Sequence, residues 1–311
     1  MHLQDIFKTN PASFSFEFFP PKSPQAAQTL FQSISELQAL KPTFVSATYG
    51  AGGSTRDLTH DLVVRLKSET TLDPVPHLTT VLHSERDIEE ILGRYAAAGI
   101  SNIMALRGDA PKGSANAAAG ESTNGDPHRD FRYAAELVRF IKKFNERGGH
   151  PDRRGFGVAV AGYPEGHPGT PNRLVELERL KAKVDEGADA IVTQLFFDNR
   201  DFYDFRERCA LAGIKVPIIA GIMPVTSMSG MERMAELALG ARFPAPLIRA
   251  LNRAAGNEES VRRVGVHWAT EQCRDLLDHR VQGIHFYTLN RSTATREIYK
   301  TLGVQDSGGL M

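Results

Sequence analysis

The chain has 311 residues, and its 37 lysines and arginines are balanced by 37 aspartates and glutamates, with no long basic run. This balance gives no support for nucleic-acid binding or for an anionic membrane surface, and it favours a small-molecule partner. The only two cysteines, Cys209 and Cys273, exclude a disulfide framework and a four-cysteine metal site, which suits a reducing cytosol.

Residues 1–10 lack the apolar stretch of a signal peptide, and no later run approaches the ~18 apolar residues of a membrane span. We therefore expect a soluble, cytoplasmic protein without membrane contact. At this length the chain can bury a sizeable core in one large domain.

The first predicted strand covers residues 14–19 and carries a single carboxylate. Phe14, Phe16 and Phe18 alternate along one face, so Glu17 points to the other face, and Pro20 ends the ladder. One interpretation is an edge-strand glutamate in water, because glutamate is usually exposed. The other is a general acid that apolar neighbours keep in its neutral form.

Seven further β-rich runs follow, with helical periodicity between them. The predicted strands cover residues 14–19, 43–48, 75–80, 102–106, 155–161, 190–196, 216–222 and 284–289. The predicted helices cover residues 25–40, 57–67, 85–98, 131–146, 173–186, 201–212 and 231–239. Gly99, Gly187 and Gly213 each follow a helical pattern, as expected of glycine caps. The alternation predicts a single-domain (β/α)8 TIM barrel over residues 1–311, with a doubly wound open sheet as the alternative.

Three segments depart from this regularity. Residues 110–129 are rich in Ala, Gly, Ser and Asn and predict a long flexible loop after the fourth strand. Residues 244–279 predict extra helix before the last strand rather than a second domain. Residues 305–311 predict a disordered tail.

Polar residues collect where the predicted strands end, which is where barrel enzymes place their catalytic groups. In strand order they are Glu17, Thr48 to Gly53, His77 and Thr79, Arg107 to Asp109, Tyr163 and His167, Gln194, Met223, and Tyr287, Asn290 and Arg291.

Each of these residues also has a plainer interpretation. Arg107-Gly108-Asp109 is either a turn with a local ion pair or a strand end where the glycine admits a flat ligand. The glycines at 50–53 lack the P-loop lysine and the GxGxxG spacing, so a plain turn is favoured. The histidines lack HxH or HExxH spacing, which favours hydrogen bonding to a ligand over a metal site, and we predict no metal. Gln194 needs partners for its amide, either backbone or a heteroaromatic edge.

Eight segments together resemble the 5,10-methylenetetrahydrofolate reductases, and they keep their order over nearly the whole chain. They are FEFFPPK at 16–22, ATYGAGG at 47–53, PHLT at 76–79, ALRGD at 105–109, YPEGHP at 163–168, TQLFFD at 193–198, GIMPV at 221–225 and HFYTLNR at 285–291. The length resembles that of the bacterial form, a catalytic barrel without a regulatory domain.

The resemblance implies an FAD-dependent oxidoreductase of one-carbon metabolism and methionine biosynthesis. NADH or NADPH would reduce the flavin and leave, and flavin N5 would then pass hydride to 5,10-methylenetetrahydrofolate, giving 5-methyltetrahydrofolate with ping-pong kinetics. Glu17 would protonate folate N10, and Asp109 would tune the flavin and stabilise the cationic folate. The family also implies a homo-oligomer.

The resemblance implies site residues at matching positions. Those expected to hold FAD are Thr48, Tyr49, Ala51, His77, Arg107, Gly108, Asp109, Tyr133, Ala134, Tyr163, His167 and Lys183. Those expected to contact the substrates are Glu17, Thr48, Asp109, Gln194, Met228, Tyr287 and Arg291. Met228 departs from the family, where some relatives have an aromatic residue that stacks on nicotinamide or folate, so the nucleotide preference stays open.

Two other function classes fit a barrel with polar strand ends. A metal-dependent hydrolase would be colourless and sensitive to chelators, and a non-catalytic binding barrel would not respond to NADH. A flavin absorbance that NADH bleaches distinguishes the reductase from both.

Overall fold

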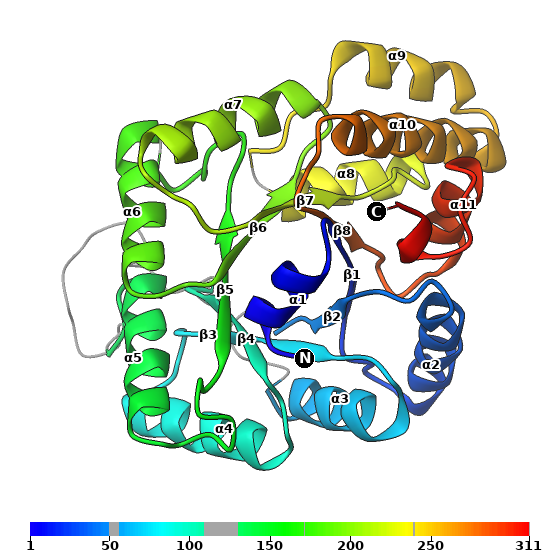
Figure 1. Ribbon diagram of the computed structural model, residues 1–311. Helices are drawn as coiled ribbons and strands as arrows, with labels where there is room; N and C mark the ends of the chain where they lie inside the picture. Colours follow the sequence, from blue (N-terminus) through cyan, green and yellow to red (C-terminus); the bar gives the residue numbers. More distant parts are fainter. Residues whose placement is uncertain (50–55, 109–129, 171, 239, 311) are drawn as a thin grey trace.

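A closed barrel of parallel strands forms the centre of the molecule (Figure 1). The computed structural model describes residues 1–49, 56–108, 130–170, 172–238 and 240–310. Its strands are β1 (Ser13–Phe18), β2 (Phe44–Ala47), β3 (Pro74–Thr79), β4 (Asn102–Leu106), β5 (Gly157–Gly162), β6 (Ala190–Leu195), β7 (Ile218–Ile222) and β8 (Gly283–Tyr287). Because β1 pairs with β8 as well as with β2, the sheet has no edge. The predicted barrel is confirmed, and the open sheet is wrong.

Helices surround the barrel on its outside (Figure 1). They are α2 (Pro24–Gln38), α3 (Arg56–Glu69), α4 (Glu85–Ala97), α5 (Ala134–Glu146), α6 (Arg173–Asp185), α7 (Asn199–Leu211), α8 (Met228–Leu237), α9 (Ala245–Ala254), α10 (Glu258–Asp278) and α11 (Thr293–Thr301). The predicted extra helix before β8 is present as α9 and α10. Gly99, Gly187 and Gly213 follow α4, α6 and α7 with φ of 71°, 105° and 78°, which confirms the predicted glycine caps.

The two faces of β1 separate apolar from polar side chains, as the alternation predicts. Phe16 is fully buried in the layer between barrel and helices, where its ring centroid lies 6.0 Å from that of Phe286 and 6.3 Å from that of Tyr299. Ser15 and Glu17 are on the opposite, interior face, since both contact His285 inside the barrel. The strand therefore packs outward and delivers its polar groups inward.

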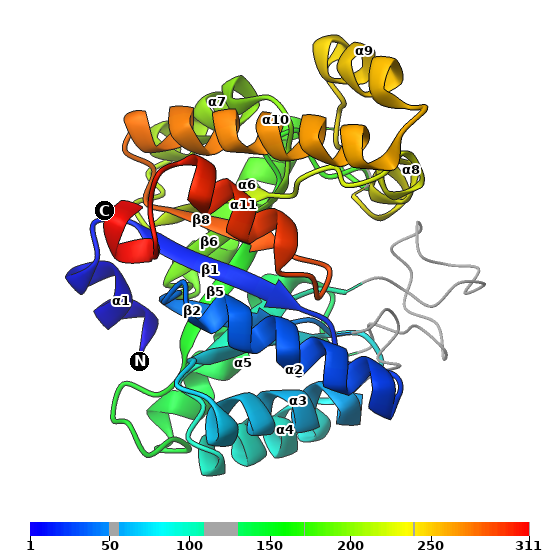
Figure 2. The same ribbon diagram turned by 90° about the vertical axis from the view of Figure 1, so that its right-hand side faces the viewer.

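A short helix that the sequence analysis did not predict closes the amino-terminal end of the barrel. This helix, α1 (Leu3–Thr9), buries Leu3 and Ile6 completely in the interior apolar cluster. Asn102 Oδ1 accepts the Leu3 N–H at 2.7 Å and ties the helix to β4. Figure 2 shows α1 at one end of the molecule and the β1 arrow pointing away from it. The open end of the barrel is therefore the one where the strands finish.

The end of the chain, for which the sequence predicts disorder, forms the short 3-10 helix Ser307–Leu310. Ser307 is buried, and both its N–H and its hydroxyl donate to the carbonyl oxygen of Leu40, at 2.9 and 2.8 Å. Tyr299 Oη lies 3.1 Å from the same hydroxyl. These bonds to α11 and to the end of α2 hold residues that composition alone marks as flexible.

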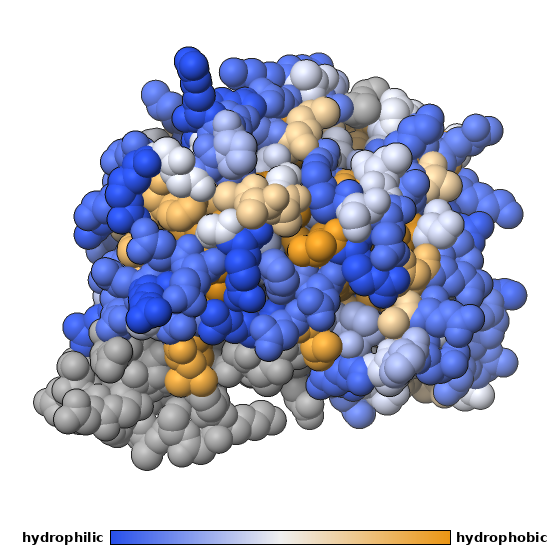
Figure 3. Space-filling view, turned by 90° about the horizontal axis from the view of Figure 1, so that it is seen from below, coloured by the Kyte–Doolittle hydropathy of each residue, from blue (hydrophilic) through white to orange (hydrophobic). Residues whose placement is uncertain are grey.

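The outer surface on the side viewed in Figure 3 is mainly hydrophilic, with apolar residues in separate small patches. This is the usual pattern for helices whose apolar faces are turned toward a barrel. Among the described residues, no helix combines the length and the apolar character needed to span a bilayer.

Candidate active site

The carboxylate of Glu17 lies near the open end of the barrel, in contact with two imidazoles. Its Oε2 is 3.5 Å from His77 Nε2, on β3, and 3.7 Å from His285 Nε2, on β8. Glu17 is only 6% exposed. The exposed edge-strand interpretation is therefore wrong, because closure of the barrel places the interior face of β1 opposite β3 and β8.

His285 is the polar residue beneath Glu17, and it is fully buried. Its Nδ1 lies 2.7 Å from Ser15 Oγ and its Nε2 lies 3.4 Å from Ser46 Oγ. The ring stacks on Phe44 with centroids 6.1 Å apart. His285 is the first residue of the motif at 285–291, but no role is predicted for it from the sequence. Its position two residues before Tyr287 in β8, on the same face, is the signal that could have found it.

Several buried polar atoms near Glu17 make no hydrogen bond among the described residues. They are Thr48 Oγ1, His77 Nε2 and Thr79 Oγ1. Burial lowers the pKa of His77 below its usual value, and the nearby Glu17 carboxylate offsets this only in part, so the ring is neutral at pH 7. Unsatisfied buried polar atoms are costly, and their gathering at the ends of β2 and β3 marks a place for a polar ligand.

The ends of β6, β7 and β8 hold Tyr287 and Gln194 at the same opening. Tyr287 donates its hydroxyl hydrogen to the Thr193 carbonyl at 2.7 Å. The ring passes over Gly221, where an added Cβ would lie 2.8 Å from Tyr287 Cε2 and 2.3 Å from the Thr193 oxygen. Burial, with the Glu17 charge nearby, raises the pKa of Tyr287 well above its usual value. The hydroxyl therefore stays protonated.

Gln194 lies within a register shift between β6 and β7. Its Oε1 accepts the Leu195 N–H at 2.9 Å, and the side chain is half-buried. Of the two partners expected for the Gln194 amide, the backbone is the one that bonds to its oxygen.

Tyr49, after β2, contacts the imidazole of His83. Tyr49 Oη lies 3.0 Å from His83 Nε2, and the rings meet edge to face with centroids 5.7 Å apart. Burial raises the pKa of Tyr49 to about 12 and lowers the pKa of His83. The pair is therefore a neutral hydroxyl hydrogen-bonded to a neutral imidazole. Within the described ranges, no group of three or more metal-ligating side chains gathers.

Several of the expected site residues follow β4 and β5. Gly108 has φ of 78°, and a Cβ there would lie 2.9 Å from Thr79 Cβ, so only glycine fits this close approach. The preceding Arg107 is exposed. Tyr163 and His167 pack edge to face with centroids 4.7 Å apart.

The remaining expected site residues lie on helices or on the surface. Tyr133 caps α5, just before Ala134, and Arg179 lies over its ring at 5.3 Å. Lys183, on α6, donates from Nζ to the Ala161 carbonyl at 2.8 Å, and burial lowers its pKa to about 8. Part of its hydrogen-bonding capacity is therefore used within the fold.

Met228 begins α8 and packs against the apolar cluster beneath it. Arg291 is exposed after β8. Asp109, Ala51, the glycines at 50–53 and the predicted loop 110–129 lie outside the described residues.

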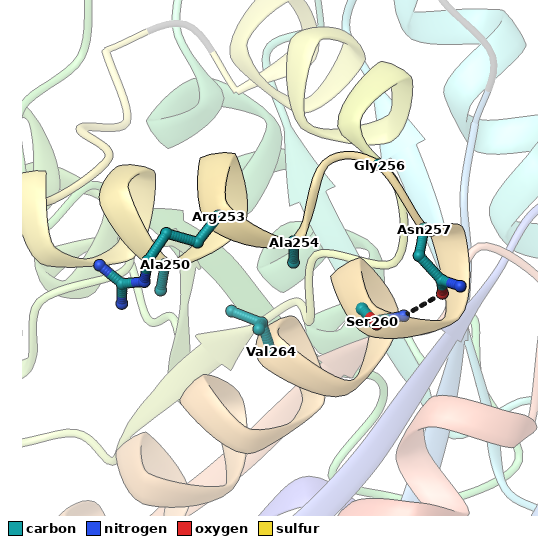
Figure 4. Close-up of a pocket in the computed structure, with 7 residues that line it drawn as sticks. All are labelled: Ala250, Arg253, Ala254, Gly256, Asn257, Ser260 and Val264. Carbon is teal, nitrogen blue, oxygen red and sulfur yellow. Dashed lines mark hydrogen bonds between the residues drawn. The ribbon is translucent and has the colours of Figure 1, made fainter.

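A hollow of about 390 Å³ lies apart from this constellation, between α9 and α10. Figure 4 shows Arg253, Asn257 and Ser260 on its wall. Asn257 Oδ1 accepts the Ser260 N–H at 2.9 Å, which is an ordinary helix cap. The hollow is open and lacks the converging polar groups found around Glu17.

Comparisons with known proteins agree with one another on the family. Residues 2–303 match the sequence model of the family described as methylenetetrahydrofolate reductase. The chain is 38% identical over 291 residues to the 5,10-methylenetetrahydrofolate reductase of Escherichia coli (strain K12), covering 94% of this chain and 90% of that protein. It is 37% identical over 314 residues to methylenetetrahydrofolate reductase (NADH) 1 of Arabidopsis thaliana, covering 98% of this chain. The chain spans 50% of the plant protein's length.

Solved structures support the fold alone. A Clostridium thermocellum protein described as binding two copies of 5-methyl-5,6,7,8-tetrahydrofolic acid superposes with a TM-score of 0.63 at 12% identity, covering 97% of this chain and 99% of that one. An oxaloacetate acetylhydrolase superposes with a TM-score of 0.50 at 11% identity, covering 99% of this chain and 87% of that one.

Proposed function

Because the chain belongs to the methylenetetrahydrofolate reductase family, a family of oxidoreductases, we propose that it reduces 5,10-methylenetetrahydrofolate to 5-methyltetrahydrofolate. FAD is the proposed bound cofactor, and NADH or NADPH the electron donor. The observation that carries the proposal is the nearly buried carboxyl of Glu17 beside two imidazoles at the open end of the barrel. A reaction that needs one proton at one atom requires such a group.

The residues present fit a flavin. Thr48 Oγ1, His77 Nε2 and Thr79 Oγ1 are buried polar atoms in need of partners, and a polar, flat cofactor offers donors and acceptors to them. When bound, FAD would supply the redox chemistry, accepting a hydride from the nicotinamide and giving one to the folate. The proposed FAD residues are Thr48, Tyr49, Ala51, His77, Arg107, Gly108, Asp109, Tyr133, Ala134, Tyr163, His167 and Lys183.

Glu17 is the proposed general acid. It holds a proton on its carboxyl and delivers it to folate N10, which opens the five-membered ring so that the methylene carbon accepts hydride. A positioned acid of this kind contributes about 100-fold to 10,000-fold in rate. Asp109 is proposed to stabilise the cationic folate that precedes hydride transfer.

The folate is proposed to contact Thr48, Gln194, Met228, Tyr287 and Arg291 beside Glu17 and Asp109. The Gln194 side chain has its Nε2 hydrogens to offer to a pterin edge, since Oε1 is bonded to backbone. Arg291 is exposed, as expected of a group that meets the carboxylates of a glutamate tail.

The test is an anaerobic titration of the purified protein, first with NADH and NADPH, then with methylenetetrahydrofolate. The proposal expects a yellow protein whose flavin absorbance bleaches with nicotinamide and returns with folate. A protein that neither carries nor binds flavin contradicts it. Loss of activity to a chelator in a colourless protein would instead indicate a metal-dependent hydrolase. A role in one-carbon metabolism belongs to this proposal, whereas the cytoplasmic location and the homo-oligomer stay predictions.

A further inference from the structure

We propose that His285 is a positioning residue that controls how readily Glu17 gives up its proton. The inference rests on the proposed function, and it extends that function to a residue beneath the reacting groups. The relevant geometry is the 3.7 Å separation between His285 Nε2 and Glu17 Oε2. No atom of His285 needs to touch either substrate.

The imidazole of His285 is held from every side. Ser15 Oγ lies 2.7 Å from Nδ1, and Ser46 Oγ lies 3.4 Å from Nε2. The ring stacks on Phe44 at 15° and meets the Tyr287 ring at 90°, with the latter centroids 5.1 Å apart. A fully buried ring that packs against two aromatic rings and has both nitrogens close to polar atoms is restricted in its orientation.

This orientation sets which charges meet Glu17. When the Ser15 hydroxyl donates to Nδ1, the neutral imidazole carries its hydrogen on Nε2, and that hydrogen faces Glu17 and Ser46. The titratable groups facing Glu17 from the described strands are His77 on β3 and His285 and Tyr287 on β8. His77 and Tyr287 are neutral at pH 7. In this tautomer, the Nε2 hydrogen is the group that offsets the negative charge left on the carboxyl when its proton leaves.

The surroundings strengthen this effect. Below His285, the barrel interior is filled by apolar side chains, including Phe44, Val75 and Ile219, and α1 covers them. Without water on that side, a fixed dipole acts on the carboxylate with little screening. Removing the Nε2 hydrogen leaves the proton more tightly held, so the acid becomes weaker.

The test compares His285→Phe with His285→Gln in the flavin-loaded protein. Phenylalanine keeps the ring packing and removes both nitrogens, whereas glutamine retains an amide N–H. We expect His285→Phe to slow the folate half-reaction about tenfold or more and to move the alkaline limb of its pH profile to higher pH, with partial rescue in His285→Gln. Bleaching by NADH should keep its rate, since Glu17 has no part in that step. Ser13→Ala, which breaks a 2.6 Å contact with Thr43 elsewhere in the interior, is the matched control.

Pairing with Glu17→Gln decides whether the effect passes through Glu17. If it does, adding His285→Phe to Glu17→Gln costs no further rate in the folate half-reaction. An equal loss with and without the Glu17 carboxyl overturns the inference. If His285→Phe fails to fold, His285→Leu takes its place as the variant without an N–H, and an unshifted pH profile in that variant overturns the inference as well. A wild-type protein that cannot reoxidise with folate overturns the proposed function instead, so the two failures are distinguishable.

Discussion

Asn290 and Phe19 are joined by two hydrogen bonds at the open end of the barrel. Asn290 Oδ1 accepts the Phe19 N–H at 2.7 Å, and its Nδ2 donates to the Phe19 carbonyl at 2.9 Å. Because Asn290 follows β8 and Phe19 follows β1, this pair fastens the closing seam of the barrel just beyond Glu17. Asn290 has φ of 62°, a conformation that asparagine tolerates better than most residues.

We expect Asn290→Ala to lower the free energy of unfolding by about 2–3 kcal/mol, from two lost hydrogen bonds and a strained backbone. Urea unfolding measures the change. Asn290→Gly is the control. Glycine adopts the positive φ without strain, so this variant measures the loss of the two hydrogen bonds alone. Equal losses in the two variants would show that backbone strain contributes nothing.

Glu17→Gln should separate the two half-reactions. The variant keeps the size and position of the side chain but cannot act as an acid, so NADH should bleach the flavin normally while folate reduction falls about 100-fold to 10,000-fold. Stopped-flow absorbance of each half-reaction measures this. Loss of both half-reactions together would point to a structural role for Glu17.

Gly221→Ala should disturb the site by overpacking. The added methyl would meet the Thr193 oxygen at 2.3 Å and Tyr287 at 2.8 Å, so β6 and β7 must separate where Gln194 lies. We expect a destabilisation of about 1–3 kcal/mol and a higher KM for folate. Gly93→Ala is the matched control, since Gly93 is in α4 with nothing within 4 Å, and it should gain about 0.5–1 kcal/mol. An unchanged KM would show that the site tolerates the shift.

Acid should destabilise the fold through its buried histidines. Burial lowers the pKa of His83 in the folded protein, and Arg56 lowers it further while Asp87 opposes. An unfolded histidine binds a proton with its ordinary pKa of 6.5, whereas the pKa of the folded His83 is lower. The unfolded state therefore binds more protons below that pH. Stability is therefore complete above about pH 7 and falls as the pH drops, by up to about 1.4 kcal/mol per pH unit for one group.

His83→Gln should flatten this pH dependence, and urea unfolding at several pH values between 5 and 7 tests it. Burial also lowers the pKa of His2, His60 and His77, so some acid sensitivity should persist. A slope identical to that of the wild type would show that His83 does not contribute. The same variant should weaken flavin binding, because the flexible glutamine replaces the fixed imidazole that contacts the Tyr49 hydroxyl.

Local patterns were enough to predict the strands, the glycine caps and the position of Glu17 on the face of β1 opposite the phenylalanines. The period of two along β1 depends only on neighbouring residues, and so does the switch from helix to glycine at residue 99. Features built from distant segments were missed. Helix α1 is short, and its apolar side chains Leu3 and Ile6 acquire partners only after the barrel closes.

The neighbours of His285 in the candidate site were missed for the same reason, because they come from distant segments of the chain. His285 acquires its significance from Ser15 and Ser46, on two other strands, and no spacing in the sequence reports that contact. Ser307 is ordered by the Leu40 carbonyl, far away along the chain. The family motifs named the positions, but the neighbours of each position come from the topology of the barrel.

Helix α1 closes one end of the barrel. Leu3 and Ile6 block the far end, so nothing that enters beside Glu17 can leave on the other side. A ligand bound beside Glu17 must leave through the same open end before another ligand binds. Two substrates that share this binding position therefore bind one after the other. The alternate binding proposed for nicotinamide and folate then follows from the single open end of the barrel as well as from the chemistry.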